Sequence, residues 1–497
     1  MNFYDYCLHY IKKKTLFLHT TFNFQQYIHI IFGSHHSIFN NSTMKKIFAF
    51  LYLIILFSIS SSAQRIVSGV AWYDQNGNSV NAHGANMLYE NGRWWLFGEY
   101  KSDTTNAFGG FSCYSSSDLT NWTFERIALP VQSDGILGPN RVGERPKVLK
   151  CPSTGKYVML MHTDDMQYKD QRTAVAVSDE INGEYRLVGP LKYHGKDLRH
   201  WDIGAFQDSD GKAYLLANHG PIYRLSDDYM SVDSLMTTIP GAGESPVMFR
   251  HQDTYYYITS NTTSWERNDN YYYTSQSVAG PWEKKGLLCP EGRLTWNSQC
   301  SYVVPVEVSD DTVYMYMGDR WSYPHQASAA TYVWQPISIT DAGINIREYH
   351  SAWSPMSVYM ERFESNCLRQ EYHTEDDFLF WGWKRKIPNF HSGDTSKKFE
   401  KKFRGTRVAF SGNTNVQSGY GRVSILSSNG DTIHTTLVDF YSLAPAHSIR
   451  YISPELPKGK YMLVVEPTGE GPVWYDKREN RYGSTGTGID VHYLYVK

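Results

Sequence analysis

The chain has 497 residues, more than one hydrophobic core usually serves, so two folded units are expected, each large enough to bury a sizeable core. Its 48 Lys and Arg residues nearly balance its 50 Asp and Glu residues, and a net charge of -2 with no basic stripe excludes nucleic-acid binding as a leading interpretation. Aromatic residues make up 15% of the sequence, which suits β-strands and also suits stacking on ring-shaped ligands.

Residues 44–63 have the pattern of a secretory signal peptide. A basic start (MKK) precedes an apolar run at 47–59 and a small-residue end (SSSA). The run is shorter than the roughly 20 residues that cross a bilayer as a helix, so cleavage after Ala63 is expected rather than a membrane span. Because a signal peptide opens a chain, we interpret residues 1–43 as a spurious upstream extension, with an unusually long leader as the alternative. The protein is therefore expected to be secreted or periplasmic.

The part after the signal peptide contains an odd number of Cys residues and no C-x-x-C pair. These residues are Cys113, Cys151, Cys289, Cys300 and Cys367. Such a set excludes a disulfide-dense scaffold and an ordinary zinc-ribbon site. One disulfide, between Cys289 and Cys300, is a candidate in an oxidising compartment, and free buried thiols are the alternative.

One pattern returns from residue 66 to residue 359: a polar turn with Gly, Asp or Asn, then a short aromatic and β-branched run. Its instances are residues 90–98, 153–160, 210–216, 251–258 and 309–316. Each predicts a hairpin turn that leads into a strand. Partner strands with polar turns follow at 114–122, 177–180, 225–229 and 274–282. The repeats predict a five-bladed β-propeller over 66–359, with a β-sandwich pair or a solenoid as the alternatives.

Past residue 355 the pattern changes to alternating strands, at 407–410, 421–426 and 460–465, separated by Gly, Asn and Pro turns. This predicts a separate β-sandwich of the jelly-roll type over 360–497, and makes the whole protein all-β. The charged stretch 397–402 (KKFEKK) is expected to be a solvated edge strand.

Four carboxylates occupy comparable places in the repeats of the predicted propeller. They are Glu99, Glu144, Asp202 and Glu244, each just before, within or at the end of an expected strand. Taken singly, each is more often a surface carboxylate. Because the innermost strands of a propeller gather at its axis, residues at one phase of successive blades are expected to converge. Cleavage of a glycosidic bond needs one carboxylic acid that stays protonated and a second group that activates water or attacks carbon.

At these residues the chain resembles glycoside hydrolase family 43, the five-bladed propeller glycosidases. The resemblance covers about 66–359. Asp202 with the segment 206–215 (FQDSDGKAYL) is similar to the family segment whose Asp orients the general acid and tunes its pKa. The segment 243–246 (GESP) is similar to the one that carries the general acid, which implies that role for Glu244.

The family's usual base, an Asp on the first inner strand, is missing from the segment 81–86 (NAHGAN). This segment, with 144–148 (ERPKV) and 298–303 (SQCSYV), is similar to the exo-β-1,3-galactanase branch, which also lacks that Asp. The resemblance implies that Gln299 handles the nucleophilic water with help from Glu144. It also implies a set of residues around the terminal sugar: Glu99, Tyr168, Asn218, Thr262 and Trp265. For Trp265 the alternative is an ordinary core tryptophan.

The expected function is inverting hydrolysis that releases terminal galactose from β-1,3-galactan, the backbone of arabinogalactan side chains. Two alternatives stay open: an α-L-arabinofuranosidase or β-D-galactofuranosidase of the same family, and a carbohydrate-binding propeller without catalysis. No cofactor is required. A structural calcium ion near His83 or His325 is compatible with the pattern, and a hydrogen-bonded structural role for these two residues is the favoured alternative. The expected partner is a plant-type oligo- or polysaccharide, and the protein is expected to be a monomer. Its C-terminal domain is expected either to bind carbohydrate or to act as a brace.

Overall fold

The computed structural model describes residues 65–359, 380, 382–476 and 478–497. The expected extension 1–43, the expected signal peptide 44–63 and Cys367 lie outside these residues, as does the start of the predicted second domain. No helix in the described ranges is long and apolar enough to cross a membrane. Strands dominate the described chain, which confirms the prediction of an all-β protein.

Five antiparallel sheets follow one another between residues 83 and 336. The first two comprise β2 (His83–Glu90), β3 (Arg93–Glu99), β4 (Phe111–Ser116) and β5 (Thr123–Leu129), then β6 (Arg141–Lys150), β7 (Tyr157–Asp165), β8 (Arg172–Ser178) and β9 (Arg186–Pro190). The next two comprise β12 (Gly204–Gln207), β13 (Ala213–Leu216), β14 (Pro221–Leu225) and β15 (Val232–Thr238), then β16 (Glu244–His251), β17 (Thr254–Ser260), β18 (Tyr271–Ser275) and β19 (Glu283–Leu287). The fifth comprises β20 (Gln299–Val308), β21 (Asp311–Arg320) and β22 (Thr331–Pro336).

The hairpins of these sheets follow from local sequence. Between β2 and β3, Glu90 pairs with Arg93, which leaves Asn91 and Gly92 as a two-residue loop. Both loop residues have positive φ, +52° and +75°, a conformation that Asn and Gly tolerate best. Alternating residues of the flanking strands then face the two neighbouring sheets.

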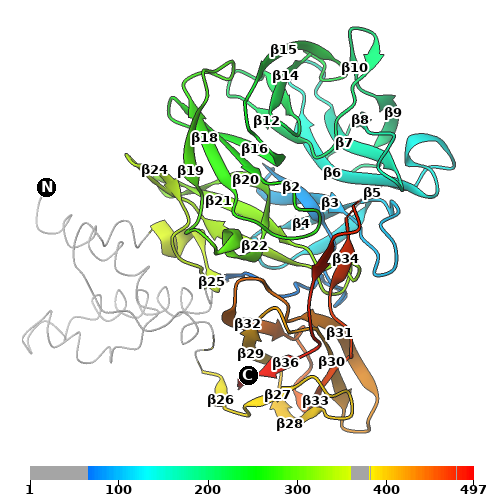
Figure 1. Cartoon of the computed structure of the whole chain (residues 1–497), viewed down its shortest axis with the longest axis vertical. Coiled ribbons are helices and arrows are strands. Elements are labelled where there is room, and N and C mark those ends of the chain that lie inside the picture. Colours follow the sequence, from blue (N-terminus) through cyan, green and yellow to red (C-terminus); the bar gives the residue numbers. More distant parts are fainter. Residues whose placement is uncertain (1–64, 360–379, 381, 477) are drawn as a thin grey trace, which may run out of the picture. The chain divides into compact units, whose positions relative to one another are not determined.

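The sheets form a ring. Strand β2 contacts β6, β6 contacts β12, β12 contacts β16, β16 contacts β20, and β20 contacts β2. A separate apolar core fills each space between neighbouring sheets, and the core that contains Leu96 and Met315 joins the fifth sheet to the first. Figure 1 shows β2, β6, β12, β16 and β20 nearest the common centre. This is the blade arrangement that the repeats predict.

Shorter elements complete the ring. Strand β1 (Ile66–Val67) pairs with β25 (Ala352–Trp353) and so ties the beginning of this region to its end. The others are the pairs β10 (Lys192–Tyr193) with β11 (Lys196–Asp197) and β23 (Ser338–Thr340) with β24 (Gly343–Asn345), the 3₁₀ turn η2 (Gly135–Leu137), and α4 (Leu294–Asn297).

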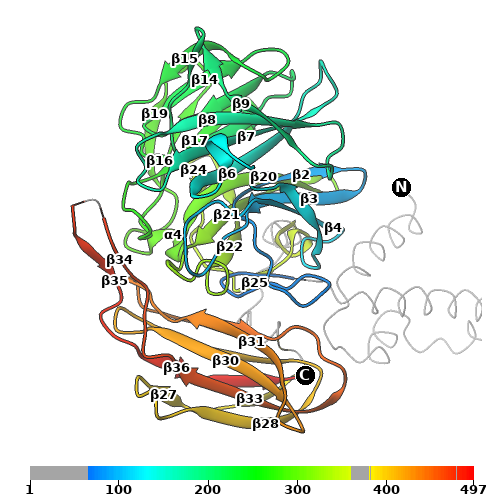
Figure 2. The ribbon, with the colours of Figure 1, turned by 90° about the vertical axis from the view of Figure 1, so that its right-hand side faces the viewer.

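The C-terminal region forms two further four-stranded sheets. One comprises β26 (Lys384–Lys386), β37 (Tyr493–Val496), β29 (Val408–Thr414) and β32 (Ala446–Ile452), in that order. The other comprises β28 (Phe399–Gly405), β33 (Gly459–Pro467), β30 (Tyr420–Ser427) and β31 (Thr432–Asp439), which Figure 2 shows side by side. The remaining pairs are β27 (Phe390–Ser392) with β36 (Ile489–Val491) and β34 (Val473–Tyr475) with β35 (Arg481–Gly483).

One apolar core is shared by both C-terminal sheets: Phe410 and Leu494 come from the first, Val423 and Leu463 from the second. Strand β28, which carries most of the Lys-rich stretch, is an edge strand, as predicted. Both Cys289 and Cys300 are buried free thiols, so the bridge considered between them does not form. Burial raises the pKa of the Cys300 thiol to about 12, because the charged thiolate is poorly solvated there.

Candidate active site

The inner strands carry irregularities where they approach the centre of the ring. The pairing register shifts between His83 and Asn86 in β2, between Glu144 and Lys147 in β6, and between Glu244 and Val247 in β16. A β-bulge re-aims the side chains beside it, and bulges are common next to active sites. The acidic residues that lie at one phase of the sequence repeat are therefore turned toward the same space.

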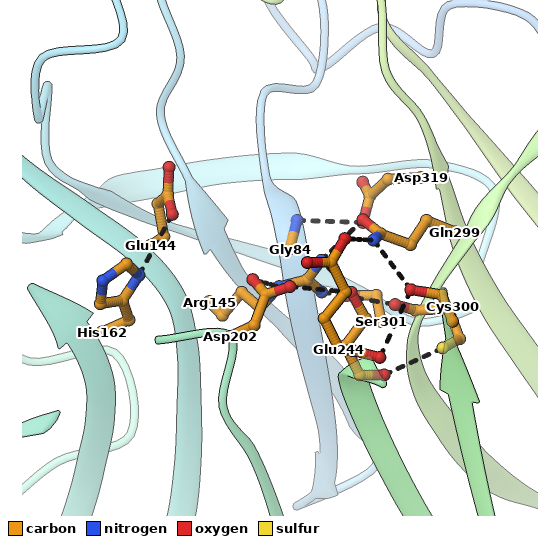
Figure 3. Close-up of polar contacts among 12 residues, drawn as sticks. Gly84, Glu144, Arg145, His162, Asp202, Glu244, Gln299, Cys300, Ser301 and Asp319 are labelled. Atoms are coloured by element: carbon orange, nitrogen blue, oxygen red, sulfur yellow. Dashed lines mark hydrogen bonds and ion pairs between the residues drawn. The ribbon is translucent and has the colours of Figure 1, made fainter. Parts of the chain in front are cut away.

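Arg145 joins these strands through its side chain, as Figure 3 shows. Its guanidinium donates to Asp202 at 2.6 Å, to Ser245 Oγ at 2.6 Å and to Gln299 Oε1 at 2.7 Å. It also donates to the backbone carbonyl of Cys300 at 3.3 Å. An always-charged, planar group that spans four partners fixes their relative positions. Arg145 is thus the hub that holds Asp202 and Gln299 beside the acid.

Glu244, at the first position of β16, has the environment of a general acid. Its side chain is buried, and its Oε1 accepts a hydrogen bond from Gln299 Nε2 at 3.2 Å. Burial, and then the negative charge of Asp202, raise the pKa of Glu244 well above the usual range of a carboxyl group. A carboxyl that stays protonated near neutral pH can deliver its proton to a leaving group.

Both ends of the Gln299 amide are occupied. Its oxygen accepts from Arg145 and from Trp321 Nε1, the latter at 2.8 Å, while its nitrogen donates to Glu244 and to Ser260 Oγ at 3.0 Å. An imidic acid form would place a hydroxyl against two N–H donors. These partners therefore hold Gln299 as an ordinary amide.

Glu144, in β6, has the opposite electrostatic environment. Its oxygens lie 3.2 Å from His162 Nδ1, accept from the Tyr168 hydroxyl at 2.7 Å, and lie 3.7 Å from Lys101 Nζ. Burial alone would raise its pKa, but Lys101 and His162 outweigh burial and hold the pKa of Glu144 well below the usual range. Burial likewise opposes the charge of His162, yet its bonds to Asp164 and Glu144 raise its pKa to about 9. Glu144 is thus an ionised carboxylate in the same site as a protonated one.

Glu99, at the end of β3, completes a set of connected acidic residues. We call this set the acidic network: Glu99, Glu144, Asp202 and Glu244. The Glu99 carboxylate pairs with Lys101 at 2.5 Å and accepts from the backbone N–H of Arg145 at 2.9 Å. Burial raises the pKa of Glu99, with Lys101 acting against it. Gly84 lies directly beside this group, with φ of +58°, and a Cβ there would come 2.1 Å from Glu99 Oε1. The close approach of β2 to Glu99 therefore requires glycine.

Three aromatic rings stand next to the acidic network. Trp265, in the loop after β17, stacks on Tyr323 at 5.5 Å between ring centroids and meets Trp321 edge-on at 5.4 Å. Lys101 Nζ lies 5.5 Å from the Trp265 ring, and Trp321 donates to Gln299. Trp265 is only half-buried, which differs from an ordinary core tryptophan. We call these three residues the aromatic wall.

The backbone that leads to Gln299 is strained. All four residues of α4 have φ between +50° and +59°, so this turn is left-handed. Such backbone costs roughly 1–2 kcal/mol per residue and persists only where its surroundings hold it. Here the Asp269 carboxylate accepts from the N–H groups of Gly292 and Leu294, each at 2.7 Å, and Arg320 donates to carbonyls within the turn.

The sequence-predicted residues fall into two groups. A continuous set of contacts joins Glu244, Asp202, Gln299, Glu144, Glu99, Tyr168 and Trp265. Asn218 is buried just after β13 and Thr262 is exposed just after β17, and in the described ranges no polar contact joins either to this set.

Sequence reasoning gave no role to Arg145, Lys101 or His162, and it placed Asp319 only in a segment that closes the last blade beside the site. The one available signal was Arg145, a charged residue in a segment expected to form an inner strand, which needs acidic partners once buried. Asp319 lies 3.1 Å from His83 Nδ1 and accepts from the N–H of Gly84 at 3.0 Å. Among the described residues, no group of three His, Cys, Asp or Glu side chains is placed to hold a metal ion.

A ring of five sheets that brings together two carboxyl groups in opposed environments provides the acid and the carboxylate that glycosidic cleavage needs, which points to a glycoside hydrolase. The sequence model of Glycosyl hydrolases family 43 matches residues 98–288. A solved structure from Bifidobacterium bifidum, provisionally named an exo-β-1,3-galactanase, is 36% identical, with a TM-score of 0.52, and the alignment covers 56% of this chain and 95% of that one. The chain belongs to glycosyl hydrolase family 43.

Two further solved structures extend the similarity. An exo-β-1,3-galactanase from Phanerochaete chrysosporium, crystallised with galactose, is 26% identical with a TM-score of 0.61, over 87% of this chain and 100% of that one. An exo-β-1,3-galactanase from Clostridium thermocellum is 27% identical with a TM-score of 0.54, over 75% of this chain and 78% of that one. A comparison with the curated proteins found no match.

Proposed function

We propose that this glycoside hydrolase releases terminal galactose from β-1,3-galactan by a single, inverting displacement. The observation that carries the proposal is the pair of opposed carboxyl environments: Glu244 is buried with a raised pKa, and Glu144 is held ionised. The names of the similar solved structures supply the sugar and the linkage.

Glu244 acts as the general acid in this mechanism. It transfers its proton to the glycosidic oxygen as the bond to the anomeric carbon breaks, so the leaving sugar departs as a neutral alcohol. Burial, and then the neighbouring charge of Asp202, keep Glu244 protonated until then. Arg145 keeps Asp202 itself in place, at 2.6 Å.

The water side of the reaction involves Gln299 and Glu144. Gln299 is in hydrogen-bond contact with Glu244 at 3.2 Å, so a sugar that enters between them must break that bond. Its nitrogen is then free to orient the attacking water. Glu144 is ionised beside Lys101 and His162, which makes it a weak base. The attacking water becomes strongly acidic as it bonds to the anomeric carbon, so Glu144 accepts its proton at that stage.

The remaining predicted residues form the subsite for the terminal galactose. Trp265 presents an aromatic face that suits the apolar side of a pyranose ring. Glu99 and Tyr168 provide polar groups from the adjoining network, and we place Asn218 and Thr262 at the edge of the same subsite. Hydrogen bonds of a carboxylate such as Glu99 to sugar hydroxyls would give specificity for one sugar over its epimers.

We further propose that the protein is exported and that its two C-terminal sheets form a jelly-roll-like β-sandwich. The apolar core shared by the sheets supports the second point. Export would bring the enzyme to polymeric arabinogalactan, which is too large to enter a cell.

Digestion of arabinogalactan and of de-arabinosylated galactan tests the proposal. Galactose is expected as the main product of both, faster from the de-arabinosylated polymer, as chromatography of timed samples would show. Release of arabinose instead of galactose would favour the furanosidase alternative. Binding of the polymer with no sugar released would favour a propeller without catalysis.

A further inference from the structure

Residues of the C-terminal domain reach the loop that carries Trp265. The Tyr441 hydroxyl donates to Glu266 Oε2 at 2.6 Å. The Tyr441 ring also lies 5.4 Å from the guanidinium of Arg267, which in turn donates to Asn297 Oδ1 at 2.8 Å. Asn297 is the last residue of the left-handed turn before Gln299. Tyr441 thus contacts the two residues that follow Trp265, and it reaches the turn before Gln299 only through Arg267.

A second set of contacts holds the loop that carries Trp321 and Tyr323. The Ser322 hydroxyl donates to Asp439 Oδ2 at 2.9 Å. The Tyr420 hydroxyl lies 3.2 Å from the carbonyl oxygens of both Ser322 and Tyr323. Asp439 is fixed in turn, because its Oδ1 accepts from the N–H of Tyr441 at 2.8 Å.

These contacts are buried. Glu266, Arg267, Asp439, Tyr420 and Tyr441 are each at most 7% exposed. Buried polar side chains that bond to one another lose more when a partner is removed than the same groups at a surface, because the remaining partner is left unpaired and poorly solvated. The arrangement is therefore well suited to fix loop positions.

We infer that Tyr420, Asp439 and Tyr441 form a clamp that positions the aromatic wall of the sugar subsite, so that the C-terminal domain is part of the catalytic unit. The clamp holds both loops that supply the wall: Glu266 follows Trp265, and Ser322 lies between Trp321 and Tyr323. None of its three residues touches the acidic network. They are positioning residues, and their role rests on the proposed function of the site they support.

The clamp is expected to affect substrate binding more than chemistry. The wall stacks on the sugar in both ground and transition states, whereas Glu244 and Asp202 act on the breaking bond. Loss of such uniform binding raises KM and leaves kcat nearly unchanged.

Tyr441→Phe tests the clamp because it removes a single hydroxyl and keeps the ring under Arg267. The KM for β-1,3-galactotriose is expected to rise about fivefold or more, with kcat changed less than about twofold. Tyr461→Phe is the matched control: the Tyr461 hydroxyl donates to Pro457 O at 2.6 Å within the C-terminal domain, so this variant should keep the wild-type KM. Equal KM values in the two variants, with both folded by circular dichroism, would overturn the clamp.

The rate of amide hydrogen exchange in residues 261–270 measures how firmly the clamp holds the Trp265 loop, and it needs no substrate. Faster exchange of these amides in Tyr441→Phe than in Tyr461→Phe is expected, and equal exchange would contradict the inference. If the wild type releases no galactose but this difference is present, the proposed function fails while the positioning role stands. If galactose is released and neither KM nor exchange differs between the variants, only the clamp fails.

Discussion

Replacement of Glu244 by Gln is expected to lower kcat/KM on β-1,3-galactan by about 10²- to 10⁴-fold, the usual contribution of a positioned general acid. Gln has the size of a protonated Glu but carries no acidic proton. The fold should survive, because the native site already favours the uncharged form of this side chain. Initial-rate kinetics on galactotriose, with unfolding measured alongside, would show the loss of rate without loss of structure.

A substrate whose leaving group needs no proton tests the role of Glu244 as proton donor. A nitrophenyl galactoside expels an anion that is stable without protonation, so Glu244→Gln should lose much less activity on it than on galactotriose. Glu307→Gln serves as the control, since Glu307 is exposed on β20 and should leave both rates unchanged. A similar loss on the two substrates would show that Glu244 does not donate the proton.

Asp202→Asn should move the alkaline limb of the kcat/KM profile to lower pH by about one unit or more, the usual scale of the effect of a neighbouring charge. Burial and, after it, the Asp202 charge raise the pKa of Glu244, and the acid works only while it is protonated. Without that charge the pKa falls, so Glu244 loses its proton at a lower pH and activity near neutral pH drops. A pH–rate profile of both proteins measures the shift.

The same pKa shift has a consequence for stability. A carboxyl whose pKa is higher in the folded state binds a proton on folding, so stability decreases as pH rises from the unfolded-state pKa through the folded-state one. Asp202→Asn should flatten this decrease. Ser245→Ala is the matched control, because Ser245 also bonds to Arg145 and Asp202 but carries no charge. An equal shift of the alkaline limb in both variants would contradict an electrostatic role for Asp202.

The convergence of the acidic residues could be predicted from the sequence, because the blade repeat ties position along the chain to position around the axis. The role given to each residue came from the resemblance to the family. Glu144 and Glu244 occupy the inner strands of the second and the fourth sheet, and residues at one phase of the repeat converge. Period-2 strands and Asn-Gly turns, as at Asn91 and Gly92, then place the hairpins. The same reasoning placed the Lys-rich stretch on the edge strand β28.

Residues whose role depends on long-range packing were not predictable in this way. Lys101 lies in a loop, yet it is within ion-pair distance of both Glu99 and Glu144. His162 resembles any polar residue in a strand, and only the fold places it between Glu144 and Asp164. The bond from Tyr441 to Glu266 spans 175 residues, and nothing local in either segment indicates it.

The anomer released first from β-1,3-galactotriose tests the mechanism most directly. Proton NMR can follow the anomeric signals before mutarotation mixes them. A single displacement with Glu244 as acid and water attacking from the opposite face gives α-galactose as the first product. First appearance of β-galactose would show retention and a covalent intermediate, and would contradict the assignment of Gln299 and Glu144 to the water.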